Sequence, residues 1–168
     1  MEELIDTLEK ESVIYERLLE LAQKKTPVIV KGNIEELTKI TDEEQIVVDQ
    51  ISHLEKKRET VTNDIADVIN KDVENLKLTN LIELLSNQPR EKRRLSEVHD
   101  KLRDVVTQVK TINEHNQDLI THSLEMVEFD LNMIQAMRQA PETANYGRSG
   151  YNAGEMLGTG MQGFDAKQ

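Results

Sequence analysis

The chain has 168 residues, with 32 acidic and 21 basic side chains, which gives a formal net charge of −11 at pH 7. This charge repels nucleic acid, whose binding depends on clustered Lys and Arg, so nucleic acid is excluded as a partner. The chain has no Cys, which rules out disulfides and Cys-ligated metal. An aromatic content of 3% argues against a β-sandwich or barrel. Apolar residues at 37% beside charged residues at 32% are typical of long amphipathic helices.

The sequence shows no sign of a secretory signal or a membrane span. Its start, Met1-Glu2-Glu3, is acidic where a secretory signal is basic. The longest apolar runs, such as Val28-Ile29-Val30, are far shorter than the ~20 residues that cross a bilayer. We therefore expect a cytoplasmic protein without membrane insertion.

Glycine and proline divide the chain into helical segments. The first is expected over about residues 2–25, and Pro27 is expected to end it because a helical Thr26 is disfavoured before proline. The second is expected over 34–69. Asn33 and Glu36 form a capping-box pattern at its start. Apolar residues then recur at alternating spacings of three and four, which indicates one buried helix face.

Two further helices are expected, a short one from Leu76 to Leu85 and a long one over 90–140, which contains no Gly and no Pro. A helix that long is stable only if an apolar face is packed. The simplest arrangement pairs 34–69 with 90–140 in antiparallel fashion, with 2–25 alongside. The predicted fold is therefore all-α, an elongated antiparallel helical bundle or coiled-coil hairpin of three long helices plus one short helix.

The third long helix is longer than its expected partner, which leaves apolar residues near 119–137 with few internal neighbours. Met126, Met133 and Met137 lie in this stretch. A Met stripe at helical spacing is often part of a core. Flexible, polarizable Met is also favoured in grooves that accept different apolar ligands. The sequence leaves both interpretations open.

Residues 141–168 form a Gly-rich C-terminal tail, with six of the seven Gly of the chain, and cannot sustain a helix. We therefore divide the chain into a helical bundle domain over 1–140 and a flexible tail over 141–168. The tail is either a disordered terminus or a segment that docks on an apolar groove. Its candidate docking residues are Tyr146, Tyr151, Met156, Leu157, Met161 and Phe164.

Two charged residues, Glu44 and Arg58, interrupt the apolar stripe of the second helix. Either they lie at an exposed edge, where their aliphatic stems cover apolar neighbours, or each pairs with a polar residue on a facing helix and fixes the register. We favour the register role. Asn113 and Asn116 on the third long helix are the candidate partners.

No catalytic or cofactor-binding motif is recognised, and we expect neither enzyme activity nor a cofactor. His115, His122 and Asp118 could share a helix face and bind zinc, but a solvated face is the ordinary interpretation. The third long helix begins with a basic cluster, Arg90, Lys92, Arg93 and Arg94. The cluster is either a solvated surface or a docking point for an acidic partner.

Three stretches within residues 1–140 form a recognisable pattern. The first runs from Leu8 through Tyr15-Glu-Arg-Leu-Leu-Glu-Leu21. The second begins at Gly32-Asn33, continues through Leu37, Ile40, Glu44 and Ile51, and ends in Leu54-Glu-Lys-Lys-Arg58. The third runs from Asn113 to Leu124, where two Asn three apart precede Leu-Ile and Ser-Leu. In these stretches the chain resembles the bacterial flagellar export chaperone for hook–filament junction proteins. The Gly-rich tail is not part of this pattern.

The resemblance implies a cytoplasmic chaperone that binds the C-terminal helical segment of hook-associated junction proteins. Such a chaperone prevents premature assembly and delivers its cargo to the flagellar type III export apparatus, and its C-terminal part is implicated in binding. Helix-in-groove recognition would suit this task. We therefore predict a cargo-binding surface made of Leu119, Ile120, Met126, Val127, Met133, Ile134 and Met137. The alternative is a structural coiled-coil adaptor that forms a homodimer through the same residues and has no cargo.

Overall fold

The computed structural model describes residues 1–69 and 78–139, and in these residues all regular structure is helical. The elements are α1 (Glu2–Val30), α2 (Ile34–Ile69), α3 (Leu78–Leu84), the 3₁₀ turn η2 (Leu85–Asn87) and α4 (Pro89–Gln139). The predicted all-α helical bundle is confirmed.

Contacts divide the chain into two units, Met1–Met126 and Val127–Gln168. No described helix combines the length and apolar character needed to cross a membrane.

Helix α1 continues one turn beyond Pro27, so the predicted end near residue 25 is wrong. Proline removes only its own N–H from the helical ladder, and the Pro27 carbonyl still accepts a hydrogen bond from the amide of Lys31 at 3.1 Å. The additional turn buries Ile29 in the core. This burial and the hydrogen bond of Thr26 described below favour a helical conformation of Thr26. The steric effect of the following Pro27 opposes that conformation.

Gly32 ends α1 instead. Its φ of 65° is a left-handed conformation that glycine adopts without strain. The Gly32 amide donates to the Ile29 carbonyl at 2.9 Å, and the Asn33 amide donates to the Val28 carbonyl at 3.2 Å. These two bonds form a Schellman motif, which satisfies the last carbonyls of the helix.

The predicted boundaries of α2 and its N-cap are confirmed. Asn33 accepts a hydrogen bond at Oδ1 from the Glu36 amide, 3.1 Å away, and its carbonyl accepts from the Leu37 amide. This is the first half of the predicted capping box. Between Leu76 and Leu85 the structure describes α3 and the first residue of η2, and Leu76 itself lies outside the described residues.

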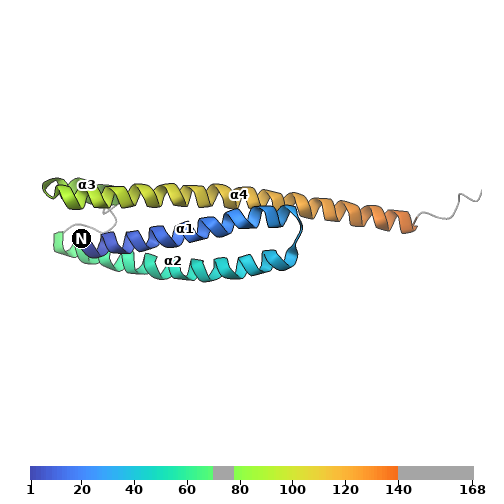
Figure 1. The fold of residues 1–168 in the computed structure, drawn as a ribbon, viewed down its shortest axis with the longest axis horizontal. Coiled ribbons are helices and arrows are strands. Elements are labelled where there is room, and N and C mark those ends of the chain that lie inside the picture. The colour runs from blue at the N-terminus through green and yellow to red at the C-terminus, as the bar shows by residue number, and fades with distance from the viewer. Residues whose placement is uncertain (70–77, 140–168) are drawn as a thin grey trace, which may run out of the picture. The chain divides into compact units, whose positions relative to one another are not determined.

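The closest helix pair is α1 with α2, not α2 with 90–140 as predicted. Figure 1 shows these two helices side by side and joined by the turn at Gly32. A connection this short requires antiparallel neighbours. The sequence pattern alone does not reveal this preference, because all three long helices have similar apolar stripes.

Helix α4 packs on this pair through two clusters of buried side chains. In the first, Leu95 of α4 joins Leu4 of α1 and Val61 of α2. In the second, Val109 of α4 joins Leu21 of α1 and Val47 of α2. This order shows that α4 runs antiparallel to α2, as predicted. Not every residue of the predicted α2 stripe is buried, since Val68 near its end is exposed.

A buried hydroxyl in α1 gives a first testable prediction. Ser12 is buried, and its Oγ has no hydrogen-bond partner among the described residues. A buried, unpaired polar group costs free energy, and Ala has the higher helix propensity. We expect Ser12→Ala to raise the free energy of unfolding by about 0.5–1 kcal/mol in urea denaturation. Ser52→Ala, on an exposed part of α2, isolates the gain from propensity alone. A clear loss of stability in Ser12→Ala would contradict the conclusion that the Ser12 hydroxyl is buried without a hydrogen-bond partner.

Candidate functional site

The candidate site consists of apolar side chains of α4 that the fold leaves exposed. Of the seven residues predicted to bind cargo, Leu119 is half-buried and the other six are exposed. Met133 and Ile134 expose 52% and 48% of their surface. The methionine stripe is therefore not buried within the described structure. Large exposed apolar residues close together on a surface are typical of protein-binding sites.

Three further residues of this kind were not among the predicted cargo-binding residues, namely Leu124, Phe129 and Leu131. Leu124 and Leu131 continue the spacing of four and three residues that begins at Ile120, so the periodicity contained a signal for them. Phe129 lies outside that repeat, and its aromatic character was the available signal. We call the following residues the exposed apolar set of α4: Ile120, Leu124, Met126, Val127, Phe129, Leu131, Met133, Ile134 and Met137.

Three members of the set belong to one unit of the chain and six to the other. Ile120, Leu124 and Met126 lie in the unit Met1–Met126, and the other members lie in the unit Val127–Gln168. None of these residues belongs to either of the two buried clusters. Helix α4 therefore has a packed part, which ends near Asn116, and a part whose apolar residues are exposed.

The polar residues of the α2 stripe pair with α1 and not with α4. Glu44 forms an ion pair with Lys25, and Arg58 Nε lies 3.0 Å from Glu11 Oε1. The candidate partners Asn113 and Asn116 form no hydrogen bond with either of them in the described structure. Two charged pairs at separate levels of the α1–α2 interface are a suitable device for fixing register. Such a role for Glu44 and Arg58 remains a proposal.

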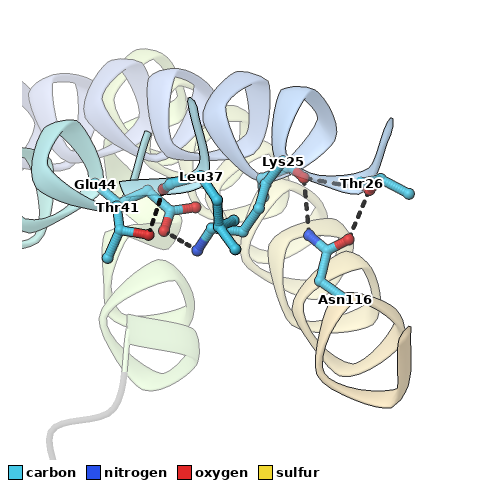
Figure 2. A network of polar contacts seen from close by, with 7 residues as sticks. Lys25, Thr26, Leu37, Thr41, Glu44 and Asn116 are labelled. Atoms are coloured by element: carbon cyan, nitrogen blue, oxygen red, sulfur yellow. Dashed lines mark hydrogen bonds and ion pairs between the residues drawn. The ribbon is translucent and has the colours of Figure 1, made fainter. Parts of the chain in front are cut away.

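Asn116 makes a buried polar contact between α4 and α1 (Figure 2). The residue is buried, and its Nδ2 donates to the Ala22 carbonyl at 2.9 Å. Its Oδ1 accepts from the Thr26 hydroxyl at 2.7 Å. Both polar ends of the amide are thus satisfied, which is the condition for burying it without a large penalty. We propose that Asn116 sets the position of α4 along α1.

The Glu11–Arg58 pair is buried on one side only. Glu11 is 1% exposed and the Arg58 side chain is 35% exposed. Desolvation raises the pKa of Glu11 above its ordinary value, and the nearby Arg58 guanidinium offsets only part of this effect.

Tyr15 donates a hydrogen bond to Glu55, 3.2 Å away. Burial, together with the negative charge of Glu55, raises the pKa of Tyr15 to about 12.

The basic cluster at the start of α4 is partly neutralised within the chain. Arg93 pairs with Glu97 at 2.8 Å, and Arg94 pairs with Glu9 of α1 at 3.1 Å. Arg94 also lies 3.8 Å from Asp6. Two of the four cationic groups therefore have acidic neighbours already, which weakens the case for docking an acidic partner here.

The two histidines of the candidate zinc group, His115 and His122, lie on exposed parts of α4. His115 is exposed, and His122 Nδ1 lies 3.3 Å from Glu125 Oε2. Within residues 1–69 and 78–139, no group of three or more His, Cys, Asp or Glu side chains is placed to hold a metal ion.

The predicted docking residues of the tail, from Tyr146 to Phe164, lie outside the described residues, as does the proposed domain boundary after residue 140.

Comparisons with known proteins identify the family of the chain. The family model described as FlgN protein matches residues 1–154, which extends beyond the residues that carry the sequence resemblance. A relative from Bacillus subtilis (strain 168), named "Uncharacterized protein YvyG", is 26% identical over 165 residues, which cover 98% of this chain and 96% of the relative. No solved structure matches the chain. The chain therefore belongs to the FlgN family, and the predicted resemblance to a flagellar export chaperone is confirmed.

Proposed function

We propose that this protein is a cytoplasmic export chaperone that binds the C-terminal helical segment of hook-associated junction proteins. It prevents their premature assembly and delivers them to the flagellar type III export apparatus. Membership of the FlgN family supports a chaperone role in the flagellum. The observation that carries the proposal further is the exposed apolar set of α4, which no described part of the chain covers.

The composition of the exposed apolar set suits a helical cargo. Its residues are aliphatic, aromatic and methionine side chains on one long helix, and an amphipathic cargo helix would bury its own apolar face against them. Methionine adapts its shape to different neighbours, which would allow one surface to accept more than one related segment. No cofactor is needed for binding of this kind.

The charges beside the exposed apolar set favour a neutral or basic cargo. Between residues 119 and 139, α4 carries Glu125, Glu128 and Asp130 against a single fixed cation, Arg138. Charges at the rim of an interface mainly influence the association rate and its dependence on salt. We expect binding to slow as salt is added if the cargo segment carries flanking Lys or Arg residues.

Light scattering of the full chain mixed with a cargo peptide tests the proposal. The peptide is synthetic and carries the C-terminal segment of a hook-associated junction protein from the same organism. A saturable 1:1 complex supports the chaperone. A homodimer whose mass does not change on addition of the peptide supports the coiled-coil adaptor instead, with the exposed apolar set buried between two copies.

A further inference from the structure

A polar pocket lies on the unit Met1–Met126, where α1, α2 and α4 meet. Its volume is about 300 Å³. Seven residues line it: Lys25, Glu44, Asn113, Asn116, Gln117, Ile120 and Thr121. Six of the seven are polar or charged, and Ile120 is the first member of the exposed apolar set of α4. The pocket therefore adjoins the surface that we propose for cargo.

Two walls of the polar pocket are held in place by contacts within the fold. Figure 2 shows Lys25 and Glu44 directed toward each other, and the Asn116 amide directed toward α1. Asn116 is fixed by its hydrogen bonds to Ala22 and Thr26. A binding group that is fixed before the ligand arrives loses little conformational entropy on binding.

Other groups of the pocket have no hydrogen-bond partner among the residues that the structure describes. Oε1 of Glu44 is buried and accepts no hydrogen bond from the described residues, although Oε2 pairs with Lys25. The exposed side chains of Asn113 and Gln117 likewise make no hydrogen bond within the described part of the chain. A buried acceptor without a donor is costly, and the exposed amides of Asn113 and Gln117 are the unpaired groups that are open to a ligand in the pocket.

We propose that the polar pocket binds one neutral hydrogen-bond donor side chain, a carboxamide or a hydroxyl, from the cargo segment that occupies the exposed apolar set. Lys25 already neutralises Glu44, which removes the electrostatic preference for a cation. The amides of Asn113 and Gln117 each offer both a donor and an acceptor, which a carboxamide matches. Apolar anchors alone permit a cargo helix to slide along α4. A single polar contact in the pocket beside Ile120 would fix the position of the cargo helix.

Substitution of the unpaired amides tests this inference, which rests on the proposed function. Asn113→Ala and Gln117→Ala remove side chains that make no hydrogen bond within residues 1–69 and 78–139, so stability should change little. We expect each to weaken binding of the cargo peptide about three- to tenfold in calorimetry, the effect of one lost hydrogen bond. Gln108→Ala is the matched control, since it removes the same exposed side chain from α4 away from the pocket.

A second measurement identifies the donor. Each Asn, Gln, Ser or Thr of the peptide is replaced by Ala in turn, and binding to the parent chain and to Gln117→Ala is compared. The inference requires one peptide position whose replacement weakens binding to the parent chain but has little further effect on Gln117→Ala. Purely additive effects at every position overturn it, as does an effect confined to Lys or Arg of the peptide.

The outcomes separate this inference from the proposed function. If the peptide binds and Met133→Ala/Ile134→Ala weakens it, while the pocket variants do not, the chaperone role is supported and the polar pocket is excluded. If the parent chain does not bind the peptide at all, both proposals are wrong.

Discussion

The double variant Met133→Ala/Ile134→Ala is expected to bind the cargo peptide roughly 10- to 150-fold more weakly than the parent chain. Complete burial of one such side chain contributes about 1.5–3 kcal/mol. Each exposes only about half of its surface in the free protein, at 52% and 48%, so binding recovers about half of this value. Two side chains together then account for about 1.5–3 kcal/mol, which converts to the stated loss of affinity. Calorimetric titration of the full chain measures it.

Two controls accompany this variant. Circular dichroism should show nearly unchanged helicity, because residues as exposed as these contribute little to the packed core. Ile46→Ala/Val48→Ala removes two apolar side chains of α2 that are also about half-exposed, at 61% and 44%, and should leave binding unchanged. If the α4 variant unfolds, the stretch belongs to a core. If both double variants weaken binding equally, the peptide binds non-specifically to exposed apolar side chains.

Arg58→Ala is expected to lower the free energy of unfolding by about 2–3 kcal/mol. The substitution removes the cation that faces Glu11 and leaves a buried carboxylate without a counter-charge. Breaking a fully buried pair typically costs about 3–5 kcal/mol, and the partial exposure of Arg58 reduces this value. Urea denaturation measures the change. Lys56→Ala is the matched control, because it removes an exposed cation two residues away with no ion pair among the described residues.

The destabilisation in Arg58→Ala should depend on pH with a defined sign. The pKa of Glu11 is raised in the folded state above its ordinary value of 4.5, so the folded chain holds this proton more tightly than the unfolded chain. The contribution of Glu11 to stability is therefore fully present below pH 4.5, and it is lost as pH rises through the folded pKa. Loss of Arg58 raises that pKa further, so the difference between variant and parent should be larger at pH 7 than at pH 4.5.

The companion variant Arg58→Ala/Glu11→Gln distinguishes charge from packing. Gln keeps the shape of Glu11 and removes its charge, so it should recover part of the stability lost in Arg58→Ala and abolish the pH dependence of the difference. If the double variant is as unstable as Arg58→Ala at both pH values, the lost packing of the Arg58 stem is responsible.

The placement of the candidate site could be predicted only in part. Periodicity and length indicated that apolar residues between 119 and 137 lack internal partners, and their exposure agrees with this. The polar pocket could not be predicted, because it requires Lys25, Glu44 and Gln117 of three different helices at one level. Phe129 was missed because it lies outside the repeat of Ile120, Leu124 and Leu131, whereas Leu124 and Leu131 were missed although they belong to it.

The sequence by itself determined the local elements. The Asn33 cap, the left-handed Gly32 and the absence of Gly and Pro from 90–139 define helix boundaries through backbone chemistry that acts over a few residues. Only the tertiary structure decided that α1 pairs most closely with α2, that Pro27 lies within a helix, and that Glu44 and Arg58 pair with Lys25 and Glu11. The physical reason is that burial of apolar surface is non-directional, so similar stripes of Leu, Ile and Val on three helices do not specify which faces meet.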